Sequence, residues 1–296
     1  MILYNGASGS LGRYMAPALG GRDVQGHALS ARLEDRSGLA DELRGLEPRT
    51  DPVFVQMAAR VSVPACEADP EGTYRINVAD TVETVRDVVT WAHELGREAH
   101  VVYVSTGHVY AEQSGRFGIA ETAPTAPRSI YATTKLQAED GLSYLAEELD
   151  FTLTVARVFG LVAPIQPPNY LLPGLIRRVR EGALDGIPGL SYIRDYLDAR
   201  DVCEDLLLLA DSPGTGPGGR RLFNVCSGAG VAIREILEMV IEQAGGAQTA
   251  TVSEAPGRPD DIAWIVGDPS AFVELTGREP QTIALSDSVG DAWASG

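Results

Sequence analysis

The first twelve residues, Met1 to Gly12, read MILYNGASGSLG and decide the fold. Ile2 to Tyr4 is a short apolar run, and a turn with glycines at positions 6, 9 and 12 follows it at once. From Leu11 onward apolar residues recur at helical spacing, so the turn lies between a buried strand and a helix. This context predicts a turn that binds a dinucleotide.

The glycines of this turn provide clearance. One permits the tight turn, another lets the backbone approach a pyrophosphate, and the third lets the helix pack closely on the sheet, while the helix N-terminus offers free N–H groups to the anion. Their three-residue spacing differs from the G-x-G-x-x-G fingerprint. Turns collect glycine in any case, so it is the position after the first strand that favours cofactor binding. The predicted cofactor contacts of the turn are Gly6, Ser8, Gly9, Ser10, Leu11 and Gly12.

The length and composition fit a globular α/β protein. A chain of 296 residues can form one large domain, or a nucleotide-binding domain with a smaller appended region. No apolar run approaches the ~18 residues of a membrane span, and no signal-peptide pattern precedes the first strand. Cys66, Cys203 and Cys226 have neither metal-ligand nor disulfide-framework spacing. We therefore expect a cytoplasmic protein with reduced thiols and no metal.

The net charge is strongly negative. The sequence has 41 acidic and 24 basic side chains and a formal charge of −17. This balance repels nucleic acid and anionic membranes, so we expect neither as a partner. An anionic ligand must then be held by local arginines and helix N-termini.

The second strand is expected within Val24 to Leu33, and residues at its end usually contact the adenosine ribose of the cofactor. A carboxylate there binds the 2′-hydroxyl of NAD, whereas an arginine accommodates the phosphate of NADP. Arg32 near this end favours NADP(H). NAD(H) stays possible, with Arg32 a solvated charge and Glu34 or Asp35 on the ribose.

Further elements follow in βα alternation. We predict helices at 37–46 and 77–95 and strands at 53–57 and 101–104. The third strand ends at Ala58-Ala59, where small side chains let the backbone lie beside a dinucleotide. The fourth is a β-branched and aromatic run, typical of a central parallel strand, and it ends in Ser105-Thr106. Ligands of open α/β sheets bind beyond the carboxyl ends of the strands, so these hydroxyls lie where chemistry is expected.

The clearest chemical signal is Tyr131-x-x-x-Lys135. On a helix, residues four apart share a face, so the phenol and the ammonium project together. A free phenol titrates near ~10, and a neighbouring cation favours phenolate and lowers that pKa towards the working range. The alternative is an ordinary amphipathic helix with a solvent-facing Tyr and Lys, which this pair alone does not exclude.

Together these signals resemble the extended short-chain dehydrogenase/reductase family, the sugar-nucleotide epimerase/dehydratase group. The glycine turn, the hydroxyl of Thr106 within STGHVY, the Tyr131/Lys135 pair and the segment 77–81 (NVADT) all match its motifs. The resemblance implies a Rossmann-like parallel sheet and makes Thr106, Tyr131 and Lys135 catalytic, with Tyr131 and Lys135 also contacting the cofactor. It further implies a homodimer through the helices at 77–95 and 131–149.

The second half resembles the 4-keto-6-deoxyhexose reductases that act on nucleotide sugars, of the GDP-4-keto-6-deoxymannose reductase type. The matching stretches are 155–160, 192–202, 223–228 and 258–261. This resemblance makes Arg194 and Arg258 candidates for the substrate diphosphate. Arginines beside Asp195 and Asp260 can equally be surface ion pairs. The predicted substrate-binding set is Ser105, His108, Asn169, Arg194 and Arg258.

One departure from the family narrows the reaction. Its 4,6-dehydratases carry an acidic pair directly after the catalytic threonine, where this chain has Gly107 and His108. Dehydration is therefore disfavoured, whereas epimerases need no such pair. We expect NAD(P)H-dependent reduction of a keto group, at C4, on a nucleotide-linked 6-deoxyhexose. The alternatives are an epimerase that retains its NAD and a catalytically silent dinucleotide-binding sensor or scaffold.

The expected architecture has two parts. Residues 1–165 form the NAD(P)-binding Rossmann domain with helices flanking its parallel sheet. Residues 166–296 form mainly a smaller substrate-binding region, with the chain returning to the Rossmann domain around 196–225.

Overall fold

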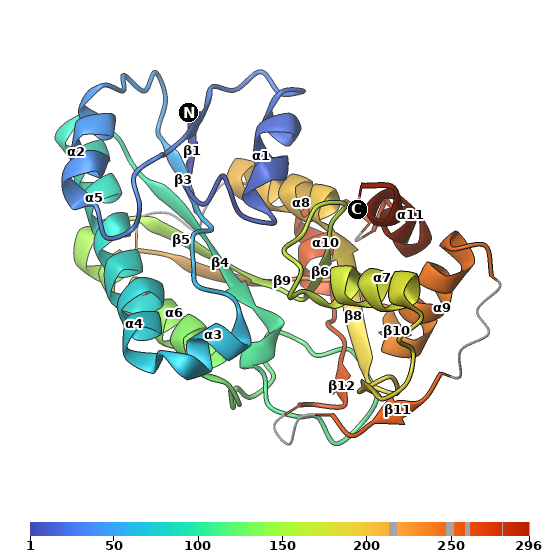
Figure 1. Ribbon diagram of the computed structural model, residues 1–296. Helices are drawn as coiled ribbons and strands as arrows, with labels where there is room; N and C mark the ends of the chain where they lie inside the picture. The colour runs from blue at the N-terminus through green and yellow to red at the C-terminus, as the bar shows by residue number, and fades with distance from the viewer. Residues whose placement is uncertain (213–217, 247–251, 258–260, 280, 296) are drawn as a thin grey trace.

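A parallel sheet carries the N-terminal part of the protein (Figure 1). The computed structural model describes residues 1–212, 218–246, 252–257, 261–279 and 281–295. Within these ranges the large sheet has six strands in the order β2-β1-β3-β4-β5-β9, all paired in parallel. Its strands are β1 (Ile2–Tyr4), β2 (Gly26–Ala28), β3 (Val53–Gln56), β4 (His100–Thr106), β5 (Thr152–Val158) and β9 (Arg220–Val225).

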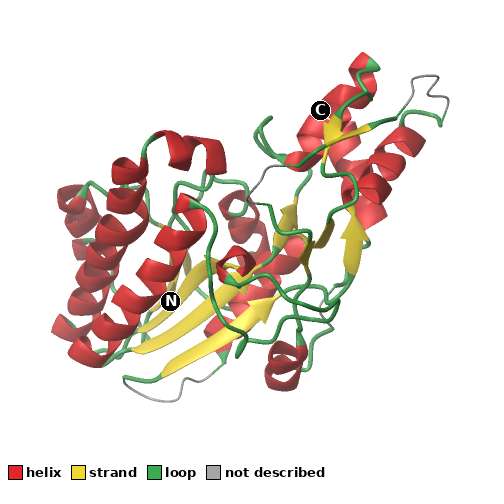
Figure 2. Ribbon diagram, turned by 90° about the horizontal axis from the view of Figure 1, so that it is seen from below, coloured by secondary structure: helices red, strands yellow, loops and turns green. Residues whose placement is uncertain are grey.

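Helices cover both faces of this sheet, as the view from below shows (Figure 2). The helices of one face are α2 (Arg36–Arg44), α5 (Thr81–Glu94) and α6 (Ile130–Leu149). The helices of the other face are α1 (Gly12–Leu19), α8 (Ala199–Asp211) and α10 (Ser270–Thr276). The fold is thus the α/β, Rossmann-like arrangement that the sequence predicts.

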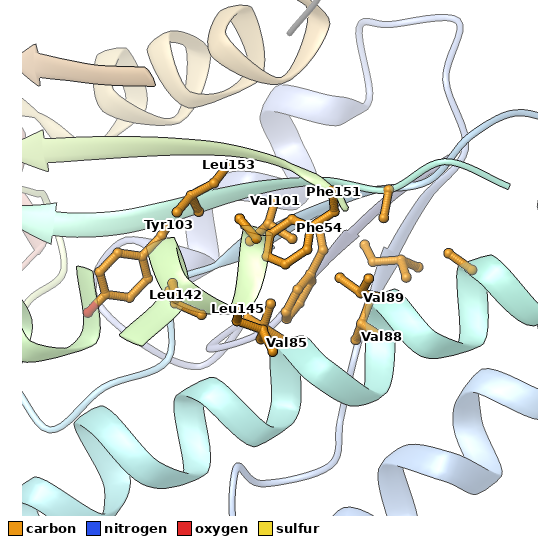
Figure 3. Close-up of a cluster of buried hydrophobic side chains, with 14 of the residues drawn as sticks. Phe54, Val85, Val88, Val89, Val101, Tyr103, Leu142, Leu145, Phe151 and Leu153 are labelled. Atoms are coloured by element: carbon orange, nitrogen blue, oxygen red, sulfur yellow. The ribbon is translucent and has the colours of Figure 1, made fainter. Parts of the chain in front are cut away.

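Strand alternation assigns side chains of β4 to the two layers. Val101 and Tyr103 pack with α5 and α6 in the first apolar cluster, whereas Val102 packs with α1 and α8 in the second. Figure 3 shows the first cluster, with Tyr103 at one end of it. Tyr103 is fully buried, so β4 and α6 are held together directly beneath the carboxyl edge of the sheet.

The predicted helix at 77–95 begins earlier and is not regular. The helical segment comprises α4 (Pro70–Tyr74), a π-helical stretch η1 (Arg75–Asp80) and then α5, and α3 (Val63–Ala68) precedes it. The widened turn places Asn77 inside the protein, where its side-chain oxygen accepts the N–H of Arg60 at 2.7 Å and its amide donates to the Thr134 hydroxyl at 3.1 Å. Such π-helical insertions often mark functional sites.

The smaller part contains a second, mixed sheet. Its central strand is β8 (Ile193–Asp198), which pairs with β6 (Gly160–Val162), β10 (Gly230–Ala232) and β12 (Trp264–Ile265). The helices packed in its core are α7 (Leu171–Glu181), α9 (Ile233–Gln243) and α11 (Leu285–Ser295), and a two-stranded ribbon joins β7 (Ile187–Pro188) to β11 (Glu254–Ala255). After β8 the chain enters α8, which packs on the large sheet, and then β9, which is a strand of that sheet. None of the helices in the described ranges is long and apolar enough to cross a membrane.

Candidate functional site

The glycine turn between β1 and α1 is closely packed against its own backbone. A Cβ at Gly12 would lie 2.1 Å from the Gly6 carbonyl oxygen, so a side chain there would displace the backbone. Gly6 adopts a left-handed φ of +71° and lies beside Ala58 at the end of β3. The turn therefore has no room for side chains at Gly6 and Gly12, and its place at the N-terminus of α1 fits a dinucleotide pyrophosphate.

A buried asparagine joins this turn to the neighbouring strand. The Asn5 side-chain oxygen accepts the N–H groups of Met57 and Ala58 at 2.9 and 2.8 Å. It thereby holds the ends of β1 and β3 side by side. Ala58 and the adjacent Ala59 are both partly buried at this edge of the sheet.

The residues after β2 bear on the choice between NADP and NAD. The Arg32 side chain is 85% exposed, and its guanidinium lies 3.9 Å from the Glu34 carboxylate. The Glu42 carboxylate of α2 accepts the N–H groups of Ser30 and Ala31 at 3.0 to 3.1 Å. Arg32 is therefore exposed to solvent directly after Ser30 and Ala31, which Glu42 holds in place. The preference for NADP stays a prediction.

The three predicted catalytic side chains come together at the carboxyl end of β4. Thr106 is the last residue of this strand, and Tyr131 and Lys135 lie one turn apart at the start of α6. The Tyr131 phenol and the Thr106 hydroxyl share a hydrogen bond. The Thr106 oxygen also accepts the N–H of His108 at 3.2 Å, within the 3₁₀ turn η2 (Gly107–Val109).

Burial controls the ionisation of this group. It lowers the pKa of Lys135 to about 7, against the opposing effect of the Glu139 carboxylate. It also raises the pKa of Tyr131, and the hydrogen bond with Thr106 only partly offsets that rise. The sequence-based expectation that Lys135 lowers the phenol pKa is therefore wrong for this arrangement. Here the Lys135 ammonium lies 4.2 Å from the centroid of the Tyr103 ring.

The Ser105 hydroxyl points toward α6 and not toward the substrate contact that the sequence predicts. Its hydroxyl donates to the Glu139 carboxylate at 2.5 Å, and the residue is 3% exposed. This hydrogen bond disfavours the predicted substrate contact, because it directs the hydroxyl at α6.

His108 and Arg194 lie near one another, in line with a shared role at the substrate. Desolvation and the charge of Arg194 lower the pKa of His108 to about 4, although the residue still reaches solvent. The imidazole is therefore neutral at pH 7 and can donate or accept a hydrogen bond. The Arg194 guanidinium donates to the Ile193 carbonyl at 2.9 Å and feels the charge of Asp261. Arg258 lies outside the described residues.

A proline-rich segment joins the second part of the protein to the glycine turn. The Tyr170 phenol is hydrogen bonded to Ser10 of the turn, and Tyr14 of α1 accepts the N–H of Ile165 at 3.1 Å. Asn169, predicted to contact substrate, is exposed and donates to the Ser62 hydroxyl at 3.2 Å. The glycine turn predicted to bind the cofactor and the segment that carries Asn169 therefore lie next to each other.

The sequence analysis missed several residues of this site. The predicted site residues do not include Tyr170, Asn77 or Glu139. Glu139 stands four residues after Lys135, so helical periodicity alone places it on the same face. Asn77 opens the NVADT motif, but only the π-helical turn shows why its side chain is buried.

Comparison with known proteins identifies the family. A family model described as the NAD dependent epimerase/dehydratase family matches residues 2–226. The chain belongs to this family. GDP-6-deoxy-D-mannose reductase of Pseudomonas aeruginosa is 25% identical over 248 residues, covering 81% of this chain and 79% of that protein. UDP-glucose 4-epimerase of Corynebacterium glutamicum is 27% identical over 256 residues, covering 81% and 74%.

A solved structure supports the same assignment at the level of the fold. UDP-glucose 4-epimerase of Thermotoga maritima, solved with UDP-glucose, superposes with a TM-score of 0.84 at 20% identity and covers 99% of this chain and 97% of that one. Family membership makes the chain an NAD(P)-dependent enzyme. The glycine turn and the Thr106, Tyr131 and Lys135 cluster are where such a cofactor and its chemistry fit.

Proposed function

We propose that this enzyme uses NAD(P)H to reduce a keto group, at C4, of a nucleotide-linked 6-deoxyhexose. The observation that carries the proposal is the meeting of Thr106, Tyr131 and Lys135 at the end of β4, with the Tyr131 phenol hydrogen bonded to Thr106. The phenol carries a proton at neutral pH and is placed to give it to an oxygen held beside Thr106. The P. aeruginosa relative is named as a reductase of a related GDP-sugar.

The chain's own residues account for the proton half of the reaction. Reduced nicotinamide, when bound, supplies the hydride that the carbonyl carbon accepts. Tyr131 donates its proton to the carbonyl oxygen, which becomes a hydroxyl, and the resulting phenolate then regains a proton from solvent. Thr106 orients the carbonyl by its hydroxyl, and Lys135 contacts the cofactor.

The proposed substrate contacts rely on local arginines. Arg194 and Arg258 would hold the diphosphate, with Asn169 as a nearby contact, because the overall charge of −17 offers no general attraction for an anion. Neutral His108 stands where the family's dehydratases carry an acid, and it is suited to hydrogen bonding a sugar hydroxyl. Arg32 would select NADP(H) by its guanidinium.

Epimerisation is the second candidate. The C. glutamicum relative is an epimerase, and an epimerase can use the same threonine, tyrosine and lysine. The two reactions differ in the fate of the cofactor, since an epimerase regenerates it in each turnover.

The test is the absorbance of reduced nicotinamide on mixing the purified protein with NADPH or NADH and freshly generated GDP- or dTDP-4-keto-6-deoxyhexose. We expect the absorbance to fall in proportion to the sugar added, faster with NADPH. An unchanged absorbance with an altered sugar would support the epimerase instead, and an unchanged absorbance and sugar would contradict both.

A further inference from the structure

A buried carboxylate lies one helical turn beyond the catalytic lysine. Glu139 is fully buried on α6. One of its oxygens accepts the Ser105 hydroxyl at 2.5 Å and Nε of Arg157 at 3.0 Å, and the other accepts Nη2 of Arg157 at 2.7 Å and Nη2 of Arg220 at 3.3 Å. Glu139 thus joins α6 to three neighbouring strands, β4, β5 and β9.

Its partner Arg157 is itself enclosed. Arg157 is 4% exposed, and its guanidinium lies 4.6 Å from the centroid of the Tyr110 ring. The Tyr110 hydroxyl donates to the side-chain oxygen of Asn224 at 2.7 Å, and Asn224 belongs to β9. The charge pair is therefore enclosed by Tyr110 and bonded at both carboxylate oxygens.

This network connects the two elements that carry the proposed catalytic groups. Ser105 directly precedes Thr106 on β4, and Glu139 follows Lys135 by one turn on α6. A shift of α6 along β4 would separate Tyr131 from Thr106 and would also break the bonds of Glu139. Buried ion pairs contribute little net stability compared with apolar packing, so stability alone is a weak reason for this one.

We propose that Glu139, paired with Arg157, is a positioning residue that fixes α6, and with it Tyr131 and Lys135, against the end of β4. This inference rests on the proposed function. Within the part of the chain that the structure describes, the titratable groups that act on Lys135 or Tyr131 are Tyr103 of β4, Glu139 of α6, Cys66 of α3 and Tyr170. Among them Glu139 is the one that favours the ammonium.

The test compares Glu139→Gln with Glu148→Gln. Glu148 lies on the same helix and forms a two-pronged pair with Arg86 at 2.9 and 3.1 Å, but at the exposed surface away from the site. We expect Glu139→Gln to lower kcat by about 10- to 100-fold with little change in KM for the keto sugar, and Glu148→Gln to behave as the unaltered enzyme. Glu139→Asp should restore part of the lost kcat.

The pH profile separates positioning from mere folding. Lys135 loses its proton as the pH rises through about 7, and without the Glu139 charge this loss occurs at lower pH. The decline of kcat/KM on the alkaline side should therefore move to lower pH in Glu139→Gln. An unchanged profile and an unchanged kcat would overturn the proposal.

Ser105→Ala provides a test that spares the ion pair if Glu139→Gln does not fold. A lower kcat with unchanged KM supports positioning through Glu139, whereas a higher KM with unchanged kcat makes Ser105 a substrate contact and contradicts it.

If the unaltered enzyme consumes no cofactor with any keto sugar, the proposed function fails. The Glu139 proposal is then judged by NADPH titration, where weakening of binding must begin at lower pH in Glu139→Gln than in the unaltered protein.

Discussion

Burial raises the pKa of Tyr131, and the hydrogen bond with Thr106 only partly offsets that rise, so the phenol carries its proton at neutral pH. Burial lowers the pKa of Lys135 beside it to about 7. The phenol proton is the one that the proposed reduction consumes. The chemistry therefore depends on one hydroxyl group more than on any other in the site.

Tyr131→Phe removes that hydroxyl and keeps the ring. We expect kcat to fall by about 100-fold or more, in the range of lost general acid catalysis. The dissociation constant of NADPH should stay close to that of the unaltered enzyme, because the glycine turn is intact. Steady-state rates and a fluorescence titration of NADPH check the two halves. A variant with a near-normal rate would remove Tyr131 from the mechanism.

At the level of single residues, the sequence predicts which residues form the site better than it predicts where their side chains point. The four-residue spacing of Tyr131 and Lys135 is sufficient to place them on one helix face. The direction of Ser105 was missed, although it follows from strand alternation: Tyr103 faces α6, so Ser105, two residues on, faces α6 as well. The pKa of Tyr131 was not predictable, because it depends on how deeply α6 packs on the sheet.

Among the elements, the turn from β1 into α1 is the most constrained. Its glycines leave no room for a side chain between the Gly6 carbonyl and the first turn of the helix. The sequence predicts this element correctly because the apolar strand, the glycines and the helical periodicity are all local. The π-helical stretch at Arg75–Asp80 was not predictable, since it depends on contacts of Asn77 with Arg60 and Thr134, far away in the sequence.

Gly12→Ala tests the glycine turn. Its Cβ would meet the Gly6 carbonyl oxygen at 2.1 Å, so α1 must move away from the turn, which typically costs about 1–3 kcal/mol. We expect a lower thermal midpoint and a marked loss of NADPH affinity. Gly21→Ala is the matched control, because nothing lies within 4 Å of its added Cβ. Equal NADPH affinity in the two variants would show that the close approach has no role in binding.

On the scale of the whole molecule, the chain passes repeatedly between its two parts. It leaves the large sheet after β5, builds β6, α7 and β8 in the smaller part, and returns through α8 to add β9 as the sixth strand. The expectation of a return around 196–225 comes from the family resemblance and not from the apolar pattern of these residues. The pairing of β8 with three short strands was not predictable, because strands of two or three residues carry too little pattern.

This crossing brings the glycine turn, the end of β4 and the residues around Arg194 to one site, and the central claim is that a ketone is reduced there. The most direct measurement is the mass of the sugar product formed with NADPH that carries deuterium at the transferable position of its nicotinamide. The account predicts a product with one deuterium on the former carbonyl carbon and an equal amount of oxidised cofactor. A changed sugar without deuterium, and without oxidised cofactor, would contradict it.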